Sequence, residues 1–247
     1  MLAVVPTGCA ARPNRPAAST GPVTGTVTVL AAASLTGAFT RIGKDFEAAH
    51  PGARVTFSFG GSSGLAQQIT QGAPADVFAA ASTTTMKQVS DAGLTPTGPV
   101  VFARNQLVIA VAKGDPKGVR GLADLARPGI TVALCAPAVP CGDAARRALS
   151  AAGVRVVPVT QEEDVKAALT KVRLGEVDAA LVYRTDVRDA GDAVTGVEFP
   201  ESAQAVNDYP IAVLADAPNP AGASAFVDYV RSPAGQAVLS AAGFQPP

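Results

Sequence analysis

The sequence predicts an α/β protein whose sheets are mostly parallel and flanked by helices. Apolar runs typical of strands alternate with segments in which apolar residues recur every three or four positions, as they do on one face of a helix. This alternation is the pattern of parallel strands joined by helical crossovers. A length of 247 residues allows two such units, so we expect two lobes.

The first lobe is expected to follow a signal remnant and flexible linker at residues 1–26 and to begin with residues 27–104. Strands and helices alternate here in regular order. The apolar stripe that runs from Leu35 through Phe39 to Phe46 is the clearest helical signal. The expected elements are strands at 27–31, 55–59 and 76–80, and helices that begin at Leu35, Leu65 and near Met86.

The same rhythm restarts in residues 105–208, which we assign to a second lobe. A long apolar strand at 209–214 is well placed to cross back, so residues 209–247 are expected to complete the first lobe. The expected elements of the second lobe are strands at 105–111, 130–134, 154–159 and 179–183, and helices at 142–152 and 164–174.

Composition argues against several classes of function. Lys and Arg together number 20, as do Asp and Glu, and charged residues make up 16% of the chain. Sparse and balanced charge provides no polyanion-binding surface, so we expect no nucleic-acid partner. No apolar run approaches the ~20 residues of a membrane-spanning helix.

The first residues resemble the end of a bacterial lipoprotein signal. A short apolar stretch ends in small residues and Cys9, and a tract rich in Ala, Pro, Ser and Thr follows. We therefore expect Cys9 to carry a lipid that anchors an extracytoplasmic protein to the membrane. The alternative is a tail with an incidental cysteine.

The other two cysteines, Cys135 and Cys141, are expected to form a disulfide in an exported protein, with two free thiols as the alternative. Pro137 and Pro140 lie between them and favour a turn. Two thiols and a single histidine, His50, are too few for a metal centre built from protein ligands.

Four junctions between an expected strand and the following helix share one property: none begins with a cationic side chain. The free N–H groups and partial positive charge of a helix start form an anion site without Lys or Arg. In open α/β sheets, ligands bind outside the carboxyl ends of the strands, where all four junctions fall. The junctions are Ala32–Ser34 before Leu35, Gly60–Gly64 before Leu65, Val139–Gly142 before Asp143, and Glu162–Val165 before Lys166.

Each side chain at these junctions also has a simpler interpretation. Ser34 and Ser62 are common helix N-caps in their own right, and Tyr183 at the end of its strand suits the rim of a core. Lys166 and Arg184 adjoin the junctions, but neighbours along an element usually point their side chains elsewhere. We expect neither cation to contact a ligand.

Several motifs resemble the periplasmic molybdate-binding proteins of ABC transporters. The resemblance extends from Val27 to the C-terminus. It implies the type II periplasmic-binding-protein fold, with the ligand in the cleft between two lobes, and it implies a monomer without a cofactor that delivers molybdate to a membrane permease. The motifs are AAASLT at 31–36, GSSGLAQQI at 61–69, GAPADVF at 72–78, VPCG at 139–142, EDV at 163–165, LVY at 181–183 and YPIAV at 209–213.

The resemblance also implies a ligand set made only of neutral donors. Carried over position by position, these are the hydroxyl and N–H groups of Ser34 and Ser62, the backbone N–H groups of Cys141 and Val165, and the hydroxyl of Tyr183. Some relatives have Ala where this chain has Cys141, a change that keeps a backbone donor. If the register slips by one residue, Ser63 is the alternative ligand.

Donors alone suit a fully deprotonated dianion, whereas phosphate near neutral pH keeps a proton that needs an acceptor. Molybdate, tungstate and sulfate all satisfy this condition, so a sulfate- or thiosulfate-binding protein is the alternative within the class. An anion-dependent enzyme is the alternative from another class, because fold does not fix function. Against it, the only paired carboxylates at a junction, Glu163 and Asp164, resemble helix-start residues.

Overall fold

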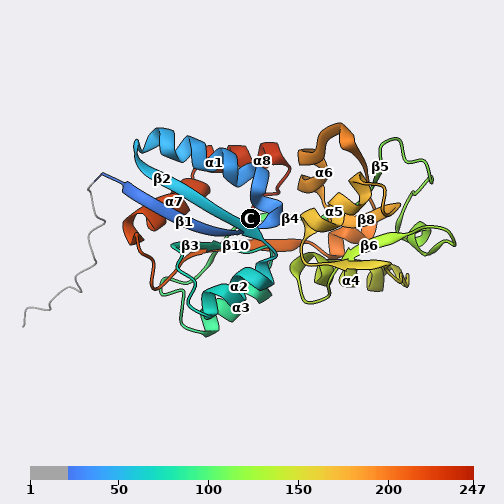
Figure 1. The fold of residues 1–247 in the computed structure, drawn as a ribbon, viewed down its shortest axis with the longest axis horizontal. Coiled ribbons are helices and arrows are strands. Elements are labelled where there is room, and N and C mark those ends of the chain that lie inside the picture. Colours follow the sequence, from blue (N-terminus) through green and yellow to red (C-terminus); the bar gives the residue numbers. More distant parts are fainter. Residues whose placement is uncertain (1–21) are drawn as a thin grey trace, which may run out of the picture.

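The computed structural model describes residues 22–247 and contains two five-stranded sheets, each covered by helices (Figure 1). This confirms the predicted two-lobed α/β fold. In the first lobe the strand order is β2-β1-β3-β10-β4, and in the second it is β7-β6-β8-β5-β9. One strand in each sheet, β10 or β5, is antiparallel to its neighbours, while the other paired strands are parallel.

The first lobe has apolar packing on both faces of its sheet. One face packs aromatic residues of α1 and α7, among them Phe39, Phe46 and Phe226, and the other face packs α2 and α3. Its elements are β1 (Thr24–Ala32), α1 (Thr36–Ala49), β2 (Gly52–Gly60), α2 (Ser62–Thr70), β3 (Val77–Ala79), α3 (Thr83–Asp91), β4 (Val100–Asn105), β10 (Asn207–Val213), α7 (Pro220–Arg231) and α8 (Pro233–Ala242).

The second lobe is smaller and has one continuous core. Its elements are β5 (Leu107–Ala112), β6 (Val132–Cys135), α4 (Pro140–Ala152), β7 (Thr160–Glu162), α5 (Val165–Arg173), β8 (Ala179–Tyr183), α6 (Arg184–Ala190) and β9 (Val194–Val197), with short 3-10 turns at Leu122–Ala126, Gly191–Ala193 and Pro200–Gln204.

Two chain segments cross between the lobes side by side. The first passes from β4 through Gln106 into β5, and the second passes from the last 3-10 turn into β10. The crossings are held in register because Asn105 pairs with Asn207 in the β4–β10 ladder. A pair of adjacent strands is a suitable hinge, since small changes in its backbone angles let two rigid lobes move relative to each other.

One predicted strand is wrong. Residues 154–159 form no regular element, and the strand of this region, β7, lies at Thr160–Glu162. Of the valines that suggested a strand, Val154 and Val156 pack partly against the core, whereas Val157 and Val159 are 80% and 61% exposed. The strand β9, which has four residues and a glycine in its interior, was not predicted from the sequence. None of the helices within residues 22–247 combines the length and apolarity needed to cross a membrane.

Candidate oxyanion-binding site

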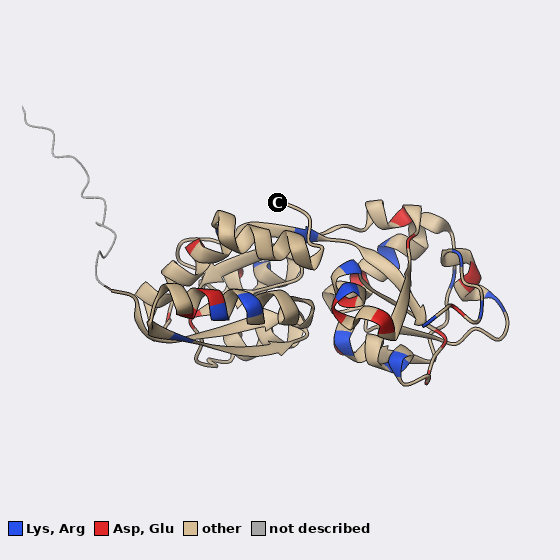
Figure 2. Ribbon diagram, turned by 90° about the horizontal axis from the view of Figure 1, so that it is seen from above, with Lys and Arg blue, Asp and Glu red and all other residues tan. Residues whose placement is uncertain are grey.

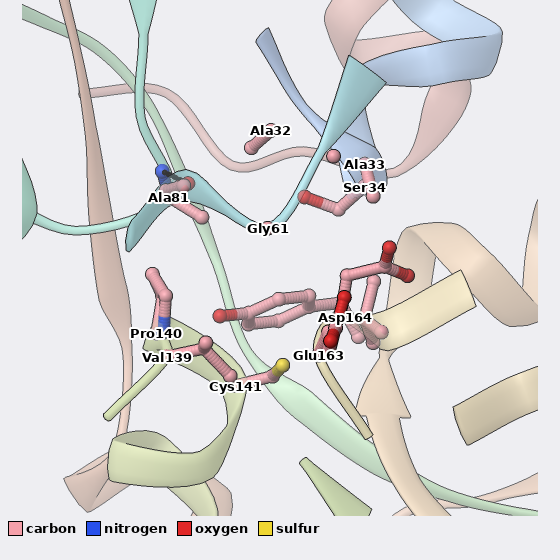
Figure 3. Close-up of a pocket in the computed structure, with 14 residues that line it drawn as sticks. Ala32, Ala33, Ser34, Gly61, Ala81, Val139, Pro140, Cys141, Glu163 and Asp164 are labelled. Carbon is pink, nitrogen blue, oxygen red and sulfur yellow. Dashed lines mark hydrogen bonds between the residues drawn. The ribbon is translucent and has the colours of Figure 1, made fainter. Parts of the chain in front are cut away.

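A small cavity lies between the lobes at the carboxyl ends of their strands (Figure 3). Its volume, measured as space open to the centre of a water-sized sphere, is about 20 Å³, far below the ~300 Å³ of a pocket for an organic ligand. The first lobe contributes Ala32, Ala33, Ser34, Gly60, Gly61, Ser62 and Ala81, and the second lobe contributes Val139, Pro140, Cys141, Glu163, Asp164, Val165 and Tyr183.

Three helices begin at this cavity. Ser62 is the first residue of α2, Cys141 is the second residue of α4, and Val165 is the first residue of α5. The N–H groups of a helix's first turn have no acceptor within the helix, and the helix dipole adds partial positive charge there. The three helix starts therefore create a positive potential in the cavity from backbone alone.

The Ser62 hydroxyl is arranged to donate a hydrogen bond into the cavity. Its Oγ accepts a hydrogen bond from the N–H of Ala81 at 3.0 Å, and the residue is 2% exposed. Because this contact uses a lone pair and not the proton, the single O–H remains free for a ligand.

Ser34 lies opposite, on the 3-10 turn Ala33–Leu35 that joins β1 to α1. Its Oγ is 2.9 Å from the hydroxyl oxygen of Tyr209, and the Nδ2 of Asn105 is 3.5 Å from the same tyrosine oxygen. If the Asn105 amide donates to Tyr209 and Tyr209 donates to Ser34, the Ser34 proton is free. In that arrangement, a chain of donors that starts on the hinge ends at the cavity.

Tyr183 is the last residue of β8 and is almost completely buried. Its hydroxyl oxygen accepts a hydrogen bond from the Nδ2 of Asn207 at 2.8 Å. Burial, with a smaller contribution from the nearby Asp186 carboxylate, raises the pKa of Tyr183 far above its ordinary value. The phenol therefore stays protonated and can act as a neutral donor.

The predicted disulfide between Cys135 and Cys141 is present, with the two Cα atoms 5.7 Å apart. It ties the end of β6 to the first turn of α4. The turn is tight, because a Cβ at Gly142 would lie within 2 Å of the carbonyl oxygen of Ala136. The bridge and this glycine together fix the position of the Cys141 N–H.

The cavity lining contains no Lys or Arg. Lys166 pairs with Asp186 and Asp189, and Arg184 pairs with Glu198. In Figure 2 basic and acidic residues are interspersed along the second lobe. Of the two acidic lining residues, Asp164 caps α5, where its Oδ1 accepts the N–H of Ala167 at 2.9 Å.

The five predicted ligand residues, Ser34, Ser62, Cys141, Val165 and Tyr183, all line this one cavity. The alternative ligand, Ser63, is not among the lining residues, and its hydroxyl donates to the carbonyl oxygen of Ala138 at 2.7 Å. This bond joins the first lobe to the second.

The predicted lipid site, Cys9, lies outside the described residues.

The sequence pattern did not reveal the residues that support the ligand set. Asn105, Asn207 and Tyr209 are buried on the two hinge strands, and Arg147 lies about two helical turns beyond the start of α4. A buried asparagine is unusual enough to be a signal, but burial is not readable from sequence before the fold is known.

One motif at the cavity is shared with hydrolases. Gly60–Gly64 has the Gly-x-Ser-x-Gly spacing of a nucleophile elbow, centred on Ser62. Such a serine needs a neighbouring base, yet no histidine lines the cavity. The chain's one histidine, His50, follows the end of α1 and packs against Phe46. Within residues 22–247 no group of three acidic, His or Cys side chains could hold a metal ion.

Two α/β lobes joined by paired strands, with a small donor-lined cavity between them, define a binding protein for a small anion. Residues 27–245 match the model of the bacterial extracellular solute-binding protein family. The chain belongs to this family of extracellular solute-binding proteins.

Named relatives give more detail. The chain is 49% identical over 237 residues to a molybdate-binding protein of Mycobacterium tuberculosis, a match that covers 95% of this chain and 91% of the relative. It is 34% identical to a molybdate-binding protein of Haemophilus influenzae, with 88% and 89% covered. The structure of a periplasmic molybdate-binding protein of Azotobacter vinelandii superposes with a TM-score of 0.79 at 23% identity, with 90% and 99% covered. The resemblance that the sequence motifs indicated is thereby confirmed.

Proposed function

We propose that this protein captures molybdate outside the cytoplasm and delivers it to the permease of an ABC transporter. The observation that carries the proposal is the convergence of three hydroxyl groups and three helix starts on one small cavity whose lining has no cation. The molybdate-binding relatives, which match over most of their length, support the same ligand.

The donor set accounts for selectivity by protonation state. Molybdate near neutral pH is a dianion without protons, and every oxygen accepts hydrogen bonds. Hydrogen phosphate brings one O–H that needs an acceptor. A ligand set made only of donors leaves that proton unpaired, which costs on the order of 1–3 kcal/mol, or several-fold to about a hundredfold in affinity.

Further parts of the proposal rest on the sequence and on ligand chemistry. Tungstate has the same charge and tetrahedral shape as molybdate, so we expect it to bind as well. Cys9 would carry the lipid anchor, the protein would act as a monomer, and its role would be binding and transfer without catalysis. Sulfate has the same charge on a smaller tetrahedron, so it is the competitor that the cavity must reject by size.

Isothermal titration of the purified protein tests this proposal. We expect tight 1:1 binding of molybdate and tungstate, with sulfate at least about a hundredfold weaker and phosphate weaker still. Equal affinity for sulfate would make this a sulfate-binding protein, and no heat with any of the four anions would refute an oxyanion ligand altogether.

A further inference from the structure

A buried asparagine stands behind the cavity at the point where the chain returns to the first lobe. Asn207 is the first residue of β10 and is 4% exposed. Its side chain contacts both lobes, because it donates to the carbonyl oxygen of Ala81 at 2.9 Å and reaches that of Pro140 at 3.3 Å. It does not line the cavity itself.

The partners of Asn207 determine which end of its amide faces which way. Its Oδ1 accepts from the guanidinium of Arg147, a group that only donates. Its Nδ2 faces the carbonyl oxygens of Ala81 and Pro140, which only accept. Reversing the amide would set donor against donor and acceptor against acceptor, so one orientation is enforced.

This orientation has a consequence for Tyr183. The Nδ2 of Asn207 lies 2.8 Å from the Tyr183 hydroxyl oxygen, so the tyrosine must be the acceptor in that hydrogen bond. An amide nitrogen in this position cannot receive the phenolic proton. With the neighbouring Tyr209 hydroxyl acting as a donor and not as an acceptor, the proton points into the cavity that Tyr183 lines.

We propose that Asn207, held by Arg147, is a positioning residue that fixes the Tyr183 hydroxyl as a donor and thereby sets the preference for fully deprotonated oxyanions. The inference rests on the proposed oxyanion function and extends it to a residue that does not touch the ligand. Without the asparagine amide, the tyrosine hydroxyl could rotate and offer a lone pair to a protonated anion such as hydrogen phosphate.

The variant Asn207→Asp tests this directly. A carboxylate in place of the amide accepts the Tyr183 proton, so the oxygen that faces the cavity loses its donor. We expect molybdate affinity to fall by at least about tenfold and the ratio of molybdate to phosphate affinity to fall as well. The added negative charge also weakens anion binding by simple repulsion, so a second variant is needed to separate the two causes.

A double-mutant cycle with Tyr183→Phe separates the two effects. If Asn207 acts through the tyrosine hydroxyl, then Asn207→Asp in the Tyr183→Phe background should cost clearly less than in the wild type. If the cost is the same in both backgrounds, the effect is repulsion or hinge distortion, and the inference is wrong.

The matched control is Asn105→Asp. Asn105 is also buried and pairs with Asn207 in the ladder, but its amide donates to Thr185 at 2.8 Å and approaches Tyr209, not Tyr183. We expect its effect on molybdate binding to be the same with and without the Tyr183 hydroxyl. Coupling as strong as that of Asn207 would contradict the specific assignment.

If Asn207→Asp does not fold, as judged by circular dichroism, Arg147→Met takes its place. The Arg147 side chain is 34% exposed, so its loss is tolerable, and it leaves the Asn207 amide free to turn. Its effect should likewise shrink in the Tyr183→Phe background, and an undiminished effect would refute the inference. Failure of the wild type to bind molybdate would instead refute the proposed function, so the two failures are distinguishable.

Discussion

A hydrogen bond from a neighbouring residue orients the Ser62 hydroxyl so that it can donate into the cavity. Its oxygen accepts the Ala81 N–H, which uses one lone pair and leaves the O–H available to donate into the cavity. Tyr183 is set in the same way by Asn207. Each of these two hydroxyls thus owes its role to a second residue whose hydrogen bond uses up a lone pair.

Removing one cavity hydroxyl should weaken binding strongly. We expect Ser34→Ala and Ser62→Ala each to cost about 1.5–3 kcal/mol, or roughly 10- to 150-fold in molybdate affinity, because each bond is made to a charged ligand. The adjacent Ser63→Ala is the control, since its hydroxyl bonds Ala138 outside the cavity, and it should cost less than about tenfold. Titration calorimetry measures all three, and unchanged affinity in both cavity variants would remove these serines from the site.

Asp186 makes the stability of the second lobe depend on pH. Burial raises its pKa to about 7, although Lys166 and the Tyr183 N–H favour the charged form. Its Oδ1 is buried without a hydrogen-bond partner and lies 3.5 Å from the Lys166 ammonium, with Asp189 also paired to that lysine. The folded state therefore holds this proton more tightly than the unfolded chain does.

Because the folded state binds this proton more tightly, protonation of Asp186 stabilises the folded state. This stabilisation is greatest below about pH 4, where the carboxyl is protonated in the folded and the unfolded state, and it is lost as the pH rises through about 7. We expect Asp186→Asn to become more stable relative to the wild type between pH 5 and pH 8, by an amount on the order of a few kcal/mol. Urea unfolding at both pH values measures this, and a constant difference would contradict the raised pKa.

The residues that line the cavity could be predicted from the sequence, but the buried residues that contact them from behind could not. Ser34, Ser62, Cys141 and Val165 fall at strand-to-helix junctions, which topology brings to one edge of each sheet. Asn207 and Arg147 act through contacts between segments 60 positions apart, and no local pattern encodes such a contact.

At the scale of elements, the start of α2 meets the start of α5 across the cleft. A Cβ built on Gly61 would lie 2.3 Å from the carbonyl oxygen of Glu163, a backbone atom that cannot move aside as a side chain can. The backbone of Gly61 has φ −60° and ψ 125°, which any residue can adopt. The glycine is thus required by the close approach of the lobes and not by its own conformation.

Gly61→Ala should therefore hold the lobes apart. We expect it to weaken molybdate binding by about tenfold or more, through about 1–3 kcal/mol of overpacking, while leaving the thermal stability of the ligand-free protein nearly unchanged. Gly64→Ala is the control, because a Cβ at that position would have no atom within 4 Å. Calorimetry and small-angle scattering with and without molybdate check the result, and a Gly61→Ala protein that binds like the wild type would show that this contact is not needed.

The disulfide between Cys135 and Cys141 joins two elements, β6 and α4. It closes a short loop between cysteines six positions apart, for which chain entropy predicts about 2 kcal/mol of stabilisation. The double variant Cys135→Ala/Cys141→Ala should lose that amount in urea unfolding. If position 141 donates through its backbone, as we propose, the molybdate affinity of this variant should fall much less than that of Ser62→Ala, and the reverse order would contradict a backbone role.

Element prediction succeeded for the long apolar stripe of α1 and for short apolar strands such as β3 and β6. It was wrong at 154–159, where Val154 and Val156 pack partly against the core but the segment forms no strand. The reversed direction of β10 and β5 also left no trace in the pattern, because orientation is set by where the chain crosses between lobes.

At the scale of the whole molecule, the two lobes form a site that neither has alone. Ser34 and Ser62 come from the first lobe, while Cys141, Val165 and Tyr183 come from the second. An anion that contacts both sets stabilises the closed arrangement by its greater affinity for it. Paired hinge strands and the interlobe bond from Ser63 to Ala138 suit a molecule that closes as two rigid bodies.

The central claim is that neutral donors from both lobes hold a doubly charged oxyanion without direct contact from a cation. A crystal structure of the molybdate complex, with the metal located by its anomalous scattering, tests it most directly. The account predicts molybdenum in the cavity between Ser62 and Tyr183, with its oxygens bonded to hydroxyl and backbone N–H groups. Molybdenum bound elsewhere, or an oxyanion held mainly by Lys or Arg side chains, would contradict it.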